Sequence, residues 1–370
     1  MRPGSVLCRL RIRFESGEHL RADLSAAVLG SDGHLWIGAD EMASVERFTA
    51  VDQRTYAEHV SFRLGDYLDL DDAQAEVDVE ALEEANGYLW VLGSHSSKRE
   101  KPKGKGAKAL KRLATISEEP GRFVLARVPL VQGTLQPSGA VTEAPGERLD
   151  AAKVARVKTR GASLTNELFA LLTDDEHLGP MLAARVPGGE RHVAIPSKDN
   201  GLDIEGLTVC GDRVLLGLRG PVLRGWAVVL EVEPRASGDG ELTLAPIGKG
   251  GERYLKHFLD LDGLGVRELS AQGDDVLVLA GPTMALDGAH RVYRYVDPAG
   301  RKKHRLVPRE VGSLEALFDV PSGEGRDRPE GVAVYSYFDP DDSILVVYDD
   351  PPPERLYGDD AVLADVFRLR

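Results

Sequence analysis

The chain alternates short aliphatic runs with tight polar turns, and this pattern repeats. The fullest copy reads Asp-Ile-Glu-Gly-Leu over residues 203–207, then the turn Gly211-Asp212, then the aliphatic run 214–218. Turns of the Gly-Asp and Asn-Gly kind accept the positive φ of a tight β-hairpin, so each copy predicts two antiparallel strands. Because the runs are almost continuously apolar, both faces of each sheet should be covered.

Four other segments repeat this phrase more or less completely. Aligned on Glu205, the five equivalent positions are Ser25, Glu80, Glu205, Arg267 and Glu330. Their numbers differ by 55, 125, 62 and 63. A period of this size indicates one supersecondary unit used several times.

Further β-rich stretches follow several copies, at residues 45–51 with 59–64, 123–129, and 226–232 with 242–247. Four antiparallel strands per unit of roughly 60 residues, packed face to face around an axis, form a β-propeller. The sequence therefore predicts an all-β fold in which residues 1–370 make a single β-propeller domain. Five blades are expected, with six as the alternative because the interval of 125 residues could hold two. Residues 7–14 alternate Leu and Arg, and this N-terminal strand can complete the last blade and close the ring.

Two inserts interrupt the repeat. Residues 98–112 carry eight basic residues against one acidic residue, together with Gly and Pro, and predict a solvated loop. Contact of this basic loop with a polyanion, either RNA or an acidic partner, is the alternative. The second insert, at about 150–183, predicts a helix that Thr165 or Ser163 caps and that ends at Gly179-Pro180. Its apolar stripe comprises Leu168, Phe169, Leu171 and Leu172.

Composition limits the classes of partner. A net charge of −14 makes nucleic acid an unlikely partner, because phosphate binding requires positive surface. The two cysteines, Cys8 and Cys210, lie in predicted strands without a CxxC motif, so we expect reduced thiols in a cytoplasmic protein. No signal peptide or spanning apolar run is visible, and we expect no membrane partner.

Charged residues concentrate in segments 196–207 and 218–226. Because the hairpin between them turns at the opposite face, both segments should reach the same mouth of the central channel. The candidate ligand-binding residues are Lys198, Asp199, Asp203, Glu205, Arg219, Arg224, His95, Glu80, Glu268 and Glu330. The arginines and Lys198 would bind a phosphate or carboxylate, and Glu205 with Asp203 would hold a divalent cation such as calcium or act as a general base.

Structural interpretations of the same residues stay open. Inward carboxylates of propellers can bind backbone N–H groups of the next blade, and Glu80 and Glu330 fit such a clamp. A lone histidine after a strand, such as His95, is often a satisfied polar residue. Residues 339–342 are acidic, but they lack the spacing of a calcium loop and belong to a predicted hairpin turn at the opposite face.

Established catalytic motifs are missing from the sequence. It contains no GxSxG, HExxH, Walker lysine loop or dinucleotide fingerprint, so it predicts no catalytic residue and leaves enzyme activity open.

The segments 196–207 and 218–226, together with Glu268-Leu269 and Gly281-Pro282-Thr283, resemble the bacterial family called domain of unknown function 3616 over nearly the whole chain. The resemblance implies a propeller and supplies no activity. The Glu-Gly-Leu phrase is more distantly similar to phytase-like esterase and calcium-dependent lactonase propellers, although the chain lacks their dense Asp/Glu/Asn calcium set. Two functions remain open. One is binding of a small anionic ligand or a cation, with or without hydrolysis, and the other is a protein-interaction scaffold that binds a partner protein.

Overall fold

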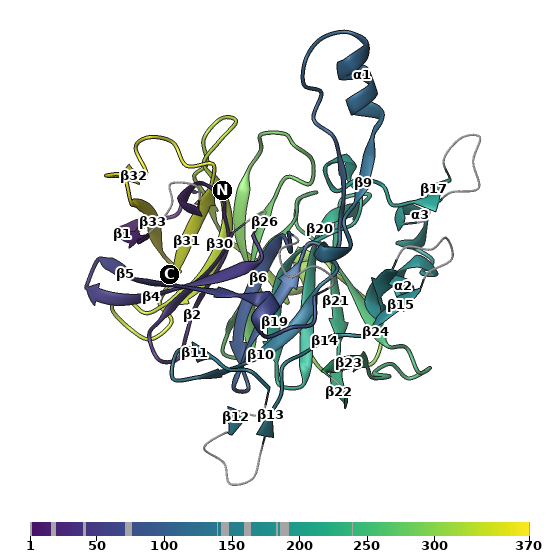
Figure 1. Ribbon diagram of the computed structural model, residues 1–370, viewed down its shortest axis with the longest axis horizontal. Coiled ribbons are helices and arrows are strands. Elements are labelled where there is room, and N and C mark those ends of the chain that lie inside the picture. The colour runs from purple at the N-terminus through teal and green to yellow at the C-terminus, as the bar shows by residue number, and fades with distance from the viewer. Residues whose placement is uncertain are drawn as a thin grey trace.

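The computed structural model describes residues 2–15, 20–39, 42–70, 76–138, 140–141, 148–158, 164–182, 184–185, 192–238 and 240–369. Figure 1 shows a chain built mostly of strands, with helices confined to a projecting arm and to one side. The fold is β-propeller-like: several sheets are arranged around a common centre.

In the described part of the chain, five strands line this centre. Each is the innermost strand of its sheet and contains the repeated phrase. They are β2 (Leu24–Leu29), β6 (Val79–Ala85), β19 (Asp203–Cys210), β25 (Gly265–Gln272) and β30 (Arg328–Tyr335). Strand β2 packs beside β6, β6 beside β19, β19 beside β25, β25 beside β30, and β30 beside β2. These inner strands therefore surround one axis.

Outward from each inner strand, three more strands continue an antiparallel ladder. In the first sheet they are β3 (Leu35–Ala39), β4 (Ser44–Asp52) and β5 (Thr55–Arg63). In the second they are β7 (Tyr88–Gly93), β10 (Leu125–Val131) and β14 (Ala152–Val154). In the third they are β20 (Arg213–Leu223), β21 (Trp226–Val232) and β24 (Tyr254–Asp260), with β28 (Arg305–Val307) added in parallel. In the fourth they are β26 (Asp275–Gly281), β27 (His290–Tyr295) and β29 (Leu314–Val320). In the fifth they are β31 (Ser343–Asp349), β33 (Ala361–Arg368) and β1 (Val6–Arg13).

The N-terminal strand β1 pairs antiparallel with β33 from the other end of the chain. Its Leu/Arg alternation follows the sheet, because Leu10 and Ile12 are fully buried while Arg9 and Arg13 are exposed. Arg11 and Ile12 of β1 also pair in parallel with Thr55 and Tyr56 of β5, which joins the first and fifth sheets along their outer edges.

One expected pairing was wrong. Residues 242–247 do not extend the third sheet. Strands β22 (Pro234–Gly238) and β23 (Glu241–Leu244) form a hairpin that pairs in parallel with β14 of the second sheet. The short β14 leaves an open edge, and β23 covers it while burying its two leucines.

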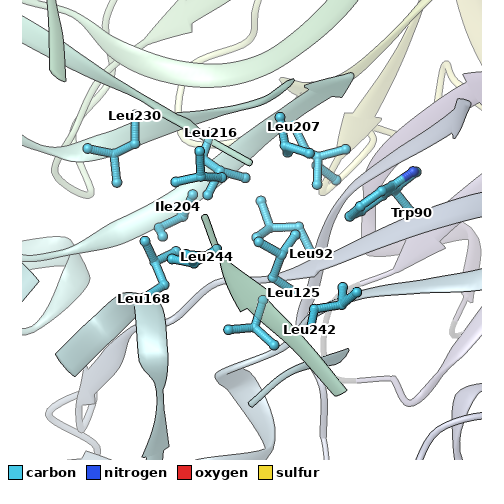
Figure 2. Packing of buried hydrophobic residues seen from close by; sticks show 14 of the residues in the cluster. Trp90, Leu92, Leu125, Leu168, Ile204, Leu207, Leu216, Leu230, Leu242 and Leu244 are labelled. Carbon is cyan, nitrogen blue, oxygen red and sulfur yellow. The ribbon is translucent and has the colours of Figure 1, made fainter. Parts of the chain in front are cut away.

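The helical insert packs on the propeller-like body, but its boundaries differ from the prediction. Helix α2 spans Glu167–Thr173, and its N-cap is Asn166, whose side chain accepts a hydrogen bond from the Phe169 backbone N at 3.0 Å. Thr165 lies in β16 (Leu164–Asn166), and Ser163 lies outside the described residues. Gly179-Pro180 begins α3 (Gly179–Leu182) instead of ending α2. Figure 2 shows Leu168 of α2 packed among core leucines of the second and third sheets, including Leu244.

The basic insert is more regular than expected. Strands β8 (Ser97–Arg99) and β9 (Ile116–Glu118) form a hairpin, and α1 (Ala107–Ala114) lies at its tip, away from the sheets in Figure 1. Residues 101–106, where Gly and Pro gather, have no regular structure. The helix was missed although Ala, Leu, Lys and Arg, which compose it, are strong helix formers.

Short elements complete the described chain: β11 (Thr134–Leu135), β12 (Ala140–Val141), β13 (Arg148–Leu149), β15 (Arg156–Lys158), β17 (Ala184–Arg185), β18 (His192–Val193), β32 (Leu356–Tyr357), and the 3-10 turns η1 (Leu20–Ala22), η2 (Leu64–Asp66), η3 (Pro120–Arg122), η4 (Ser197–Asp199) and η5 (Arg309–Val311). Among the helices described, none has the length and apolarity needed to cross a membrane.

Candidate functional site

Each inner strand contains a β-bulge at the same place in the repeat. The pairing register shifts across the positions that the sequence aligned, namely Ser25, Glu80, Glu205, Arg267 and Glu330. A bulge leaves a residue out of the ladder and redirects its side chain. The repeated phrase therefore encodes a bulge in each inner strand, and four of the five bulge positions carry an ionisable side chain.

The glycine after the glutamate has a packing role. A Cβ on Gly206 would lie 2.9 Å from Leu269 Cγ and 3.0 Å from the Leu269 backbone N. A Cβ on Gly331 would lie 2.7 Å from backbone atoms of the neighbouring strand β2. Both contacts are too short, so the Glu-Gly phrase lets adjacent inner strands approach each other closely beside the bulge.

Two arginines and three carboxylates form a connected network at this level. Arg219 of β20 forms ion pairs with Asp203 and with Glu205, the latter at 2.6 Å from Nη1 to Oε1. Arg267 Nη1 lies 3.1 Å from Glu205 Oε2 and 2.8 Å from Glu330 Oε2. Glu205 thus links the two guanidinium groups. All five side chains are buried.

A sixth residue extends the network toward β6. One carboxylate oxygen from each of Glu80, Asp203 and Glu205 lies within 4.8 Å of the others. We call these three residues the acidic triad. Oxygen ligands bind calcium at 2.3–2.6 Å, so carboxylate oxygens at this separation can share one such ion.

The network contains more acid than base. Among the described residues, the three buried acids Asp203, Glu205 and Glu330 share two guanidinium groups, those of Arg219 and Arg267. Full ionisation of these three acids would leave one negative charge in excess, which is costly in a buried place.

The pKa values of two acids respond to this excess. Burial raises the pKa of Asp203 to about 7 even though Arg219 opposes the shift, and the charge of Glu205 raises it further. Burial likewise raises the pKa of Glu330 to about 7, against the effect of Arg267. Both carboxyls therefore hold protons close to neutral pH. In addition, Asp203 Oδ1 is buried and has no hydrogen-bond partner among the described residues.

Glu268 has a different role from its neighbours. Its Oε1 accepts hydrogen bonds from the backbone N of Leu269 at 2.8 Å and of Leu207 at 3.4 Å. It therefore clamps the third and fourth sheets together. From the sequence we considered hydrogen bonding to the backbone of the next blade for Glu80 and Glu330. Glu330 instead forms an ion pair with Arg267.

His95 is a structural residue by its contacts. Its ring is almost fully buried, with Nδ1 2.7 Å from the Gly93 carbonyl oxygen and Nε2 2.6 Å from Asn166 Nδ2. Burial lowers the pKa of His95 to about 4, so the ring is neutral. Because Asn166 also caps α2, His95 fastens the helical insert to the second sheet.

The remaining candidates stay outside the network. Lys198 and Asp199 lie exposed in η4, and Asp199 pairs with Arg99 at 2.7 Å. Arg224 is exposed at the turn between β20 and β21. The anion grip expected from Lys198, Arg219 and Arg224 is therefore not assembled, since Arg219 is already paired with acids.

Two features went unrecognised in the sequence. Arg267 was aligned with the ring but not counted as a binding residue, although it is the counter-ion of two glutamates. Asp78 precedes Val79-Glu80 as Asp203 precedes Ile204-Glu205, and it pairs with the buried Arg122 at 2.8 Å. The repeated Asp-Φ-Glu order could have indicated this second Asp–Arg pair.

The fold and the site together define a class of protein. Its members have a β-propeller-like body and ionisable residues at bulges along the axis. Residues 23–365 match the family model described as protein of unknown function (DUF3616), and the chain belongs to that family. This confirms the family resemblance seen in the sequence. No curated protein matches the chain.

Solved structures similar to the chain have low sequence identity. The PQQ-bound aldose sugar dehydrogenase from Streptomyces coelicolor is 11% identical, with 98% of this chain and 97% of that chain covered and a TM-score of 0.40. Virginiamycin B lyase from Staphylococcus aureus is 9% identical, with coverages of 97% and 99% and a TM-score of 0.36. A luciferin-regenerating enzyme is 8% identical, with coverages of 98% and 96% and a TM-score of 0.33.

Proposed function

We propose that the protein is a five-bladed β-propeller that binds a divalent cation at its acidic triad and, through that cation, a small anionic ligand. Five blades are supported by the five inner strands around one axis, each continued by three strands. Strand β1 supplies the outermost strand of the fifth blade, which supports closure of the ring by the N-terminus. The free cysteines support a cytoplasmic location within this proposal.

The observation that carries the proposal is the excess of buried carboxylates over guanidinium groups. A divalent cation would offset this excess of negative charge. The buried, unpartnered Oδ1 of Asp203 offers it an oxygen, and Glu80 and Glu205 lie close enough to share it. Carboxylate oxygens are hard ligands, so the expected ions are calcium or magnesium.

A cation held by three carboxylates would keep coordination positions for oxygens from outside the protein. Calcium accepts six to eight oxygen ligands, so an anionic ligand or water would complete the shell. This route to an anion does not need the dispersed Lys198 and Arg224. Because a bound cation polarises phosphoryl and carbonyl oxygens and activates water, hydrolysis is the natural extension of the proposal.

A protein-interaction scaffold is the second candidate, and a specific observation favours it. Each guanidinium of the network is already paired, and Glu268 is bonded to backbone amides. In this alternative the acids of the axis hold protons, tie the blades together and bind no ion.

Thermal unfolding with and without calcium or magnesium separates the two functions. A ligand at a hundred times its Kd stabilises the folded state by about 2.7 kcal/mol. For a chain of this size that corresponds to a rise in Tm of about 3–5 °C. The wild type should show this rise, and Glu80→Gln should abolish it because it removes a ligand and keeps the shape.

The matched control is Glu58→Gln, which removes an exposed acid on β5, the fourth strand outward from the axis in the first sheet. It should keep the full response to the ion. An unchanged Tm for the wild type at millimolar calcium and magnesium would overturn the cation site. The protein-interaction scaffold would then be the remaining candidate function. An equal rise in wild type and Glu80→Gln would show that the ion binds elsewhere.

A further inference from the structure

The basic arm, residues 97–118, differs in charge from the rest of the molecule. Three of its basic side chains form ion pairs: Lys98 with Glu76 at 2.6 Å, Arg99 with Asp199 at 2.7 Å, and Arg112 of α1 with Glu100 of the arm itself at 3.0 Å. Five lysines are exposed and form no ion pair within the described part of the chain. They are Lys101, Lys103, Lys105, Lys108 and Lys111.

Helix α1 in this arm is amphipathic and has no buried residue. Leu110 and Leu113, three positions apart, share one face and are 68% and 44% exposed. Lys108 and Lys111 lie on the other side of the helix. Large apolar side chains exposed side by side with unpaired charges mark a surface that contacts something else.

We infer that α1 docks on an anionic lipid surface, with its leucines in the interface and its lysines beside the headgroups. This inference is independent of the axial cation site. An amphipathic helix with lysines on one face and leucines on the other is typical of helices that lie in the membrane interface. The lysines supply attraction to anionic lipids and the leucines supply apolar contact, so a lipid surface uses both features.

A nucleic acid or a protein groove would not contact both the lysines and the leucines of the arm. A nucleic acid would pair with the lysines and leave Leu110 and Leu113 in water, and the arm has no aromatic side chain on which bases could stack. A protein groove that holds a helix reads anchors at i, i+3, i+4 and i+7. Here α1 ends at Ala114, one residue after the second leucine, so a third large anchor is missing.

The position of α1 suits contact with a plane. The hairpin of β8 and β9 carries the helix away from the sheets, as Figure 1 shows. The acidic body is a repulsive element, but its field is screened over about 8 Å at physiological ionic strength. From the sequence we expected no membrane partner, because it lacks a spanning segment, but a peripheral contact requires none.

Vesicle flotation of the full chain tests the inference. Vesicles of phosphatidylglycerol and phosphatidylcholine in equal parts should bind the wild type at low salt, and pure phosphatidylcholine vesicles should not. Each lysine near an anionic surface strengthens binding about fivefold, so the triple change Lys105→Gln, Lys108→Gln and Lys111→Gln should weaken it about a hundredfold. Leu110→Ala with Leu113→Ala should weaken it about tenfold or more, while alanine preserves the helix.

Matched controls use equally exposed residues outside the arm. Lys302→Gln with Lys303→Gln removes exposed lysines, and Leu306→Ala removes a leucine that is 64% exposed. All controls should bind like the wild type.

Three outcomes would overturn the inference. One is a wild type that ignores anionic vesicles at low salt. Another is loss of binding in the lysine variant with full binding in the leucine variant, which would mean adsorption by charge alone. The third is binding of double-stranded DNA or polyglutamate by a wild type that fails to float, which would assign the arm to a polyanion.

Discussion

Replacing Glu205 by glutamine tests the charge balance of the axial network. The change preserves the shape of a side chain that accepts from Arg219 at 2.6 Å and Arg267 at 3.1 Å. Each guanidinium keeps another carboxylate, Asp203 or Glu330 respectively. Glutamine keeps one acceptor oxygen, so one of the two hydrogen bonds becomes a weaker one to a neutral acceptor, at about 1 kcal/mol. The other is lost, because the amide NH2 faces a guanidinium donor, and this costs about 2 kcal/mol, or about 3 kcal/mol together.

An opposing gain appears only when the other acids are ionised. The charge of Glu205 contributes to the raised pKa values of Asp203 and Glu330, both about 7. A carboxyl whose pKa is raised on folding costs stability above its folded pKa and costs nothing below its unfolded pKa. If each pKa falls by about one unit in the variant, the gain above pH 8 is about 1.4 kcal/mol per group.

The two effects predict a dependence on pH. Glu205→Gln should lower the free energy of unfolding by about 3 kcal/mol at pH 5 and leave it within about 1 kcal/mol of the wild type at pH 8. Urea unfolding at the two pH values, without divalent cations, measures both numbers. An equal loss at pH 5 and pH 8, or a larger loss at pH 8, would refute the argument from excess negative charge.

The other predictions concern the cation, the counter-ion, closure and the arm. Calcium should raise Tm more at pH 8 than at pH 6, because protons on Asp203 compete with the ion near its pKa of about 7; an equal rise at both pH values would contradict this. Arg267→Gln should destabilise the protein by about 3–5 kcal/mol at pH 8, since it leaves two buried glutamates short of a counter-ion, and by less at pH 5; urea unfolding measures the difference. Deleting residues 1–14 should lower Tm markedly because it exposes the edge of β33, and an unchanged Tm would count against closure by β1. Replacing residues 101–114 by a Gly/Ser linker should change the free energy of unfolding by less than about 1 kcal/mol, because the segment buries no residue; a larger loss in urea would show that it packs on the body.

The inner strands were predictable because their information is local. The Glu-Gly phrase and the turn after it set a bulge and a hairpin within a few residues, and the same phrase recurs in each sheet. The alternation of apolar and basic residues over positions 7–14 likewise predicted an outer strand. The family resemblance rested on the same segments.

The misplaced elements depend on contacts between distant residues. An apolar strand such as 242–247 does not specify which open edge it will cover, and only the fold shows that β14 is short. Asn166 and not Thr165 is the cap because β16 continues through Asn166, so the helix begins only at Glu167. Similarly, no local pattern shows that Arg267 bridges glutamates of two neighbouring sheets.

The repeated bulge separates the chemistry of the axis from the architecture around it. A bulged residue takes no part in the regular ladder, so the sheets keep their register whatever side chain stands there. The five positions already hold three types of side chain: a hydroxyl at Ser25, a guanidinium at Arg267 and carboxylates at the others. Single substitutions at these positions would exchange ligand donors on an unchanged frame. The chain thus has five positions on its axis at which the donor atom can change without a change in strand pairing.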